Sequence, residues 1–306
     1  MTMRNHRLFG TVRVLACAML VLVTPAHAEE KSSVDVSRIV SFGGDVTEIL
    51  YALGYEPNIV AVDTTSVYPA DALAKKKNVG YMRALSTEGV LSLTPTVIMA
   101  ADDAGPPEVV AALKSSTVAY VTISGADNPA GTAERIRAVA ASVGAAGQGE
   151  QLVAGVQKKY ASLAEKRATI GKPARVLFLL SVQSGRATAG GTGTAAHEVI
   201  ELAGGTNVAA AFSGYKPLSD EASIGLAPDV ILVMKRSQRP GQPSTEPIEK
   251  IIGAMPGLNA TPAARNGRII EVDGAALLQF GPRTADAALD LMRILHPNKQ
   301  AAKGGQ

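Results

Sequence analysis

The sequence predicts an α/β protein with two Rossmann-like lobes, each built on a parallel sheet and joined by a single long helix. Two internal echoes predict this fold. The segment 86–98 returns as 219–231, with Ser86 and Ser219, Glu88 and Glu221 in matching places and a proline before each final apolar run. The segment 48–54 is matched in type by 198–204, and each follows a glycine pair. Two echoes in the same order indicate related lobes, whose boundary is a common place for a ligand cleft.

Short apolar runs alternate with segments of helical spacing, which is the pattern of β-α-β units with covered sheet faces. The predicted N-terminal lobe covers 37–146, with a helix at 45–53 and strands at 38–42, 58–62, 96–100 and 118–123. The predicted C-terminal lobe covers 174–298, with strands at 174–182, 230–234 and 268–272 and a final amphipathic helix at 283–295.

A helix is expected to link the lobes over 147–170. Its apolar residues recur at three-and-four spacing, and Gly171 and Pro173 follow it as stop signals. Lobes joined by one helix move less than lobes joined by several flexible crossovers. We therefore expect only a modest closure around a ligand.

The two ends of the chain read as non-structural segments. Residues 1–28 combine three arginines, an apolar run at 14–23 and small residues at Ala26 and Ala28, which is typical of a secretory signal peptide. The run is about half of the roughly 20 residues that a membrane-spanning helix needs. Lipid attachment through Cys17 is a minor alternative. Residues 299–306 are predicted to be a disordered tail, and the rest of the chain is expected to be exported.

Charge and cysteine content narrow the class of partner. The chain has 30 Lys and Arg against 27 Asp and Glu, and three of the arginines lie in 1–28, so the exported part is neutral. A neutral surface argues against a nucleic-acid partner. The only cysteine is Cys17, so the exported protein relies on its core rather than on disulfides. We expect a soluble monomer.

The usual signatures of enzymes are missing. There is no Gly-x-Ser-x-Gly motif, and the glycine-rich run Gly190-Gly191-Thr192-Gly193 lacks the lysine of a phosphate loop. Beyond residue 28 the only histidines are His197 and His296, too few for a zinc site of His and Cys. The sequence therefore predicts no catalysis.

Tyr81 and Arg83 flank one residue in a loop just before the first copy of the repeat. Two residues apart in an extended loop, their side chains can point the same way. A neighbouring guanidinium favours the phenolate form of tyrosine, and phenolate oxygen suits ferric iron. The alternative is structural: the ring packs under the loop while Arg83 pairs with a surface acid.

Several of these features together resemble the periplasmic haem-binding proteins of bacterial haem ABC importers. They are the export signal, the two lobes with a long linking helix, the Ser-x-Glu repeat, the segment 80–90 and the late Gly281-Pro282-Arg283. The resemblance implies ferric haem b as the transported ligand, with Tyr81 as the iron ligand and Arg83 hydrogen-bonded to its phenolate. It also implies an inner-membrane ABC permease dimer with its ATPase as partner, and an outer-membrane haem receptor upstream.

The wider family shares two glutamates, one per lobe, that dock onto arginines of the permease. Glu88 and Glu221 match these two positions. The alternative is that each glutamate only caps its own helix after the preceding serine, although the spacing is one residue short of a capping box.

Haem also brings two carboxylates, so the cleft should offer cations at its mouth. Lys235 and Arg236 follow a strand of the C-terminal lobe, at the edge where open α/β sheets bind ligands. Arg236 resembles an arginine that family members direct at the haem. Arg186, Gly43 and Gly44 also end strands and are further candidates for the cleft, while solvated loop charges are the alternative for the lysine and arginines.

The sequence departs from some relatives at the second iron ligand. These supply a histidine from the C-terminal lobe, whereas 181–191 contains none. Iron should therefore be bound by Tyr81 alone, unless Met82, His197 or Tyr215 approaches it. A siderophore or cobalamin binder of the same fold is the alternative function, and the chain has no tryptophan, which argues against cobalamin. An exported two-lobed enzyme with Tyr81 as a general acid is the third reading.

Overall fold

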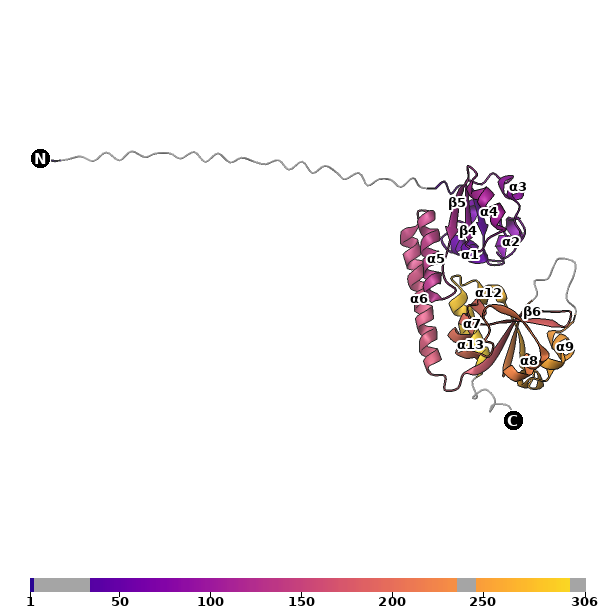
Figure 1. Cartoon of the computed structure of the whole chain (residues 1–306). Coiled ribbons are helices and arrows are strands. Elements are labelled where there is room, and N and C mark those ends of the chain that lie inside the picture. Colours follow the sequence, from indigo (N-terminus) through magenta and orange to yellow (C-terminus); the bar gives the residue numbers. More distant parts are fainter. Residues whose placement is uncertain (3–33, 236–245, 298–306) are drawn as a thin grey trace. The chain divides into compact units, whose positions relative to one another are not determined.

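The computed structural model describes residues 1–2, 34–235 and 246–297 (Figure 1). Residues 3–28 of the predicted signal peptide, with Cys17, lie outside the described residues, as do Arg236 and the whole predicted tail. None of the described helices is long and apolar enough to cross a membrane.

The first sheet is fully parallel and has the strand order β3-β2-β1-β4-β5. Its central strand is buried along its whole length, as a strand covered on both faces must be. The elements of this lobe are β1 (Ile39–Phe42), α1 (Gly44–Ala52), the short 3₁₀ helix η1 (Glu56–Asn58), β2 (Ile59–Val62), α2 (Asp71–Lys75), β3 (Lys77–Asn78), α3 (Thr87–Leu91), β4 (Val97–Ala101), α4 (Pro107–Lys114), β5 (Ala119–Ile123) and α5 (Pro129–Ser142).

The second sheet has the order β11-β10-β6-β7-β9, and β8 also pairs with β6. The elements of this lobe are β6 (Ala174–Gln183), β7 (Arg186–Gly190), α7 (Ala195–Leu202), β8 (Gly205–Asn207), β9 (Tyr215–Leu218), α8 (Asp220–Leu226), β10 (Val230–Met234), α9 (Ile248–Gly253), α10 (Pro256–Asn259), α11 (Pro262–Arg265), β11 (Ile269–Val272), α12 (Gly274–Leu278) and α13 (Thr284–Leu295).

The α/β fold with two sheets is confirmed, but the expectation that both sheets are parallel is wrong for the second. There β7 runs antiparallel to both β6 and β9. Only Ser184 and Gly185 separate β6 from β7, and both have positive φ, at 50° and 72°. These values are those of a two-residue hairpin turn, whereas a parallel neighbour needs a crossover of about a dozen residues or more.

Helix α6 (Ala146–Ala168) packs against α5 of the first lobe and against α13 of the second (Figure 1). Its buried residues Val153, Val156, Tyr160 and Leu163 form the stripe that the sequence spacing predicts. Through this stripe the largest core cluster is continuous, since it includes strand residues of both sheets. The described part of residues 33–306 accordingly forms one compact unit. The lobe limits 37–146 and 174–298 stay predictions, and each sheet lies within one of them.

Candidate functional site

The loop that contains Tyr81 is held by buried neighbours. Met82 and Leu85 are each 5% exposed and belong to a core cluster of the first lobe. Backbone hydrogen bonds to Gly105 also fix the loop. The N–H of Gly105 donates to the carbonyl of Met82 at 2.9 Å, and its carbonyl accepts from the N–H of Leu85 at 3.1 Å. With Met82 buried between them, Tyr81 and Arg83 are left on the exposed side of the loop.

Arg83 joins a phenol to a carboxylate. Its Nη1 donates to the hydroxyl of Tyr81 and its Nη2 to a carboxylate oxygen of Asp103. Burial lowers the pKa of Arg83, but the hydrogen bonds to Tyr81 and Asp103 and the charge of Asp103 outweigh it, so the pKa lies above its ordinary value. Tyr81 is 43% exposed and is not packed under the loop. The sequence analysis missed Asp103, although two aspartates directly after β4 were a usable signal.

A buried aspartate shapes the loops next to this group. Asp63 directly follows β2 and is fully buried. It accepts hydrogen bonds from the backbone N–H of Gly43 at 3.0 Å and of Thr65 at 2.8 Å, and from the hydroxyl of Ser66 at 3.1 Å. These bonds fix the loops that follow β1 and β2 at the carboxyl edge of the sheet. Gly43, one of the predicted cleft residues, thus helps to fix this loop through its backbone N–H. Its φ of +106° favours glycine.

A second group of buried charges lies at the start of α1. The carboxylate of Asp45 is 3.4 Å from Nε of Arg135, whose Nη2 contacts Asp127 at 2.9 Å. The side chains of Asp45 and Arg135 are each 9% exposed. Burial raises the pKa of Asp45 to about 6, and the charge of Arg135 offsets this only in part. Sequence spacing gave no sign of this contact, because its two partners lie in different helices.

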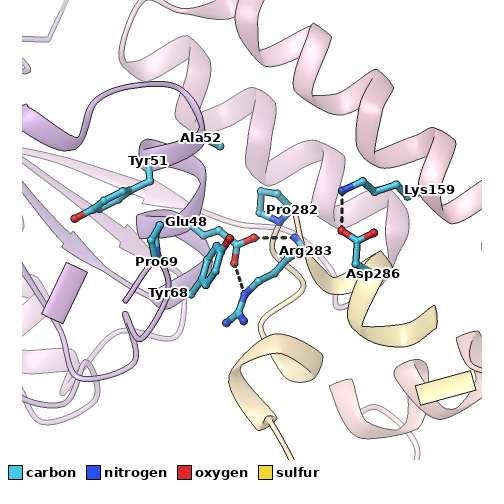
Figure 2. A pocket seen from close by; sticks show the side chains of 9 residues that line it. All are labelled: Glu48, Tyr51, Ala52, Tyr68, Pro69, Lys159, Pro282, Arg283 and Asp286. Atoms are coloured by element: carbon cyan, nitrogen blue, oxygen red, sulfur yellow. Dashed lines mark hydrogen bonds and ion pairs between the residues drawn. The ribbon is translucent and has the colours of Figure 1, made fainter. Parts of the chain in front are cut away.

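The two lobes meet in a further ion pair (Figure 2). Glu48 of α1 accepts the backbone N–H of Arg283 at 2.7 Å and its Nε at 3.0 Å. The guanidinium of Arg283 also lies 4.3 Å from the ring centroid of Tyr68, and 3.6 Å from the carboxylate of Asp273. Burial raises the pKa of Glu48, although the charge and hydrogen bonds of Arg283 act against this. The Gly281-Pro282-Arg283 motif therefore reaches the first lobe in this structure.

Neighbouring contacts extend this junction. The side chain of Gln279 donates to the carbonyl of Thr65 at 2.9 Å, and Lys159 of α6 pairs with Asp286 of α13 at 2.7 Å. A Cβ on Gly44 would come within 2.4 Å of Gln279, so Gly44 packs against the second lobe. A cavity of about 340 Å³ opens beside the junction without involving Tyr81, and its lining is Glu48, Tyr51, Ala52, Tyr68, Pro69, Lys159, Pro282, Arg283 and Asp286.

The repeated Ser-x-Glu motif begins two equivalent helices. Ser86 caps α3 by accepting the N–H of Gly89, and Ser219 caps α8 by accepting the N–H of Ala222, each at 3.2 Å. Glu88 and Glu221 follow two residues later and are exposed. Among the described residues neither carboxylate forms an ion pair. Bonds to its own backbone N–H and to the hydroxyl of Ser219 lower the pKa of Glu221.

The remaining candidates lie on the second lobe. Lys235 follows β10 and Arg186 begins β7, and both are exposed. His197 is half-buried, with Nδ1 3.3 Å from the side-chain amide nitrogen of Asn207. Met82, as a core residue, is not free to approach an iron, whereas Tyr215 is 37% exposed. No group of three or more His, Cys, Asp or Glu able to hold a metal occurs in the described part of the chain.

Solved structures of similar fold are named as haem-binding proteins. The periplasmic heme-binding protein RhuT of Roseiflexus sp. RS-1 in apo form is 37% identical, with a TM-score of 0.80, over 85% of this chain and 98% of that one. The periplasmic heme-binding protein BhuT, in complex with two hemes, is 34% identical with a TM-score of 0.77, over 84% of this chain and 97% of that one.

Curated relatives place the chain among transport proteins. The uncharacterized ABC transporter substrate-binding lipoprotein YvrC of Bacillus subtilis (strain 168) is 25% identical over 90% of this chain and 87% of its own length. A vitamin B12-binding protein of Vibrio cholerae (strain O395) is 33% identical, but only over 34% of this chain and 36% of its own length. Residues 39–276 match the family described as periplasmic binding protein. The chain therefore belongs to the periplasmic binding protein family, as the non-enzymatic substrate-binding protein of an ABC transporter.

Proposed function

We propose that the protein binds ferric haem in the periplasm and delivers it to the permease of an ABC importer, with Tyr81 as the iron ligand. The observation that carries this proposal is an open phenol whose oxygen accepts a hydrogen bond from the guanidinium of Arg83. Tyrosine oxygen is a known axial ligand of haem iron. Asp103 fixes the other side of the guanidinium and so holds it at the phenol.

Two further observations support haem. RhuT and BhuT are named as haem binders, and their identity to this chain extends over most of its length. Arg186 and Lys235 are exposed cations on the second lobe, and they would meet the two carboxylates of the haem. Arg236, a further predicted cation, lies outside the described residues.

Titration of the purified protein with hemin tests the iron ligand. The native protein is expected to give the visible spectrum of a tyrosinate-bound ferric haem, and Tyr81→Phe to lose it and to bind about tenfold more weakly, since only the iron contact is removed. Tyr68→Phe is the matched control, because Tyr68 is an equally open tyrosine of the same lobe, 46% exposed. It should keep both the spectrum and the affinity. An unchanged spectrum in Tyr81→Phe would remove Tyr81 as the ligand.

Glu88 and Glu221 are proposed to dock the two lobes onto the permease dimer. Both are exposed at the same position of capped helices, so equivalent carboxylates can meet equivalent arginines on two permease subunits. Glu88→Arg combined with Glu221→Arg should abolish haem uptake by cells while hemin binding by the isolated protein stays unchanged. Glu108→Arg, an exposed acid in the first turn of α4, is the control. Normal uptake by the double variant would show that docking uses other residues.

Vitamin B12 is the second candidate, because several B12-binding proteins match about a third of the chain. The chain has no tryptophan to stack on the corrin, and the Tyr81–Arg83 pair has no evident role in holding it. Calorimetry with cyanocobalamin distinguishes the two. Binding of cyanocobalamin in preference to hemin would replace haem as the proposed ligand. The chain belongs to a family of substrate-binding proteins that are not enzymes, which excludes the enzymatic alternative.

A further inference from the structure

The glycine-rich run Gly190–Gly193 is not a phosphate loop, and its first glycine packs against the ring of Tyr215. A Cβ on Gly190 would come within 3.1 Å of the Cε1 of Tyr215, and one on Gly191 within 2.2 Å of the carbonyl oxygen of Phe212. Gly190 and Tyr215 are paired residues of β7 and β9. The absence of side chains thus lets the ring of Tyr215 lie directly against strand β7.

The β7–β9 ribbon has one buried and one open face. Ala187 and Ala189 face a core cluster of the second lobe, together with Leu218 of β9. Since alternate residues of a strand point to opposite faces, Arg186 and Thr188 lie on the other face, beside the paired residues Pro217 and Tyr215. Arg186, Pro217 and Tyr215 are exposed and Thr188 is half-buried. This open face carries a ring at one end and a cation at the other, roughly 13 Å along the strand.

Charges of the first lobe act on Tyr215. The charge of Asp127 raises and that of Arg83 lowers the pKa of its phenol, so the phenol is within electrostatic reach of Arg83. Its hydroxyl bonds to the Thr194 hydroxyl and to the Ala196 N–H at the start of α7. Burial nevertheless raises the pKa of Tyr215 above its ordinary value, so the side chain is a neutral phenol at neutral pH. A neutral phenol that is already hydrogen-bonded is a poor iron ligand but a good apolar surface.

We propose that Tyr215 packs its ring against the macrocycle of the ligand on the side opposite Tyr81, with Arg186 at the far end of the same strand face meeting a ligand carboxylate. This inference rests on the proposed haem function and gives that site its second wall. Aromatic rings stack favourably on flat π-systems with an offset geometry. The two tyrosines would then have different tasks, one through its oxygen and the other through its ring.

Hemin titrations of three variants in the full chain separate these tasks. Tyr215→Ala should bind hemin about tenfold more weakly and keep the native visible spectrum, because the iron contact remains. Tyr215→Phe should bind within about twofold of the native protein, since only a hydroxyl held by α7 is lost. Tyr215→Leu keeps apolar bulk and should give an intermediate affinity. Ile224→Ala, at a residue of the same lobe that is 52% exposed, is the control and should bind normally.

The outcomes are distinguishable from failure of the haem proposal. If the native protein does not bind hemin, the proposed function itself fails. If the native protein binds but Tyr215→Ala binds equally well, the inference about Tyr215 is overturned and haem binding stands. If Tyr215→Phe alters the spectrum as Tyr81→Phe does, Tyr215 is an iron ligand and the stacking role is wrong. Thermal unfolding of Tyr215→Leu checks that the lobe still folds, and its affinity decides the question where Tyr215→Ala does not fold.

Discussion

Glu48→Ala is expected to lower the free energy of unfolding by about 3 kcal/mol, because removal of one partner leaves a charge without its counter-ion. The side chain of Glu48 is 6% exposed and that of Arg283 is 20% exposed. Arg283 keeps the ring of Tyr68 and the more distant Asp273, which holds the loss at the lower end of the usual range for buried pairs. Urea unfolding at neutral pH measures it.

A matched pair at the same junction supplies the control. Lys159 of the linking helix and Asp286 of α13 also form an ion pair, but their side chains are 49% and 55% exposed. Asp286→Ala should therefore cost no more than about 1 kcal/mol. Glu48→Gln should fall between the two, since it keeps one acceptor oxygen and avoids the cost of a buried charge. If Glu48→Ala costs no more than Asp286→Ala, the junction does not depend on the buried pair.

Stability is expected to rise as the pH falls from 7 to about 4, mainly because of Asp45. In the unfolded chain this carboxyl has its ordinary pKa of 3.8, whereas burial raises the folded value to about 6. Between these values the folded chain holds a proton that the unfolded chain does not, so lowering the pH favours the folded state. The difference corresponds to about 3 kcal/mol, which is present below pH 4 and lost as the pH rises through 6.

Asp45→Asn should flatten this dependence, measured as urea unfolding at pH 5 and at pH 7.5. Part of the slope should remain, because burial also raises the pKa of Glu48 in the same direction. Asp290→Asn, a change at an exposed carboxylate with a side chain 68% exposed, should leave the slope unaltered. The charge of Arg135 lowers and that of Asp103 raises the pKa of Asp45, and the charge of Asp45 in turn raises the pKa of Glu48. An identical slope in Asp45→Asn and the native protein would refute the assignment to this carboxyl.

The parts of the site that the sequence could predict are those encoded by near neighbours. Tyr81 and Arg83 are two positions apart with Met82 buried between them, so their common orientation follows from spacing alone. Ser86 and Ser219 cap their helices through residues only three positions away. The strands and the linking helix could be predicted because the spacing of their apolar residues is visible in the sequence.

What the sequence did not disclose depends on residues far apart in the chain. Glu48 lies in the predicted helix 45–53 and has the pattern of an ordinary charge on a helix surface. Nothing near it in the sequence indicates that its partner is Arg283, the residue just before α13. Asp45 and Arg135 are hidden for the same reason. Strand β7 was missed because a serine-glycine turn between short polar stretches reads equally well as a loop. The predicted roles of Tyr81, Arg83, Arg186, Lys235 and the two docking glutamates stay predictions.

The continuous core along α6 and the Glu48–Arg283 pair act as two separate attachments between the sheets. If one sheet rotates about the core along α6, the Glu48–Arg283 pair must lengthen or break. Opening of the two lobes therefore costs free energy. We expect binding to the permease to aid release of a bound ligand, because contacts with the permease can offset the cost of breaking this ion pair. A variant with a weakened second attachment should accordingly lose cargo to solution faster when no membrane partner is present.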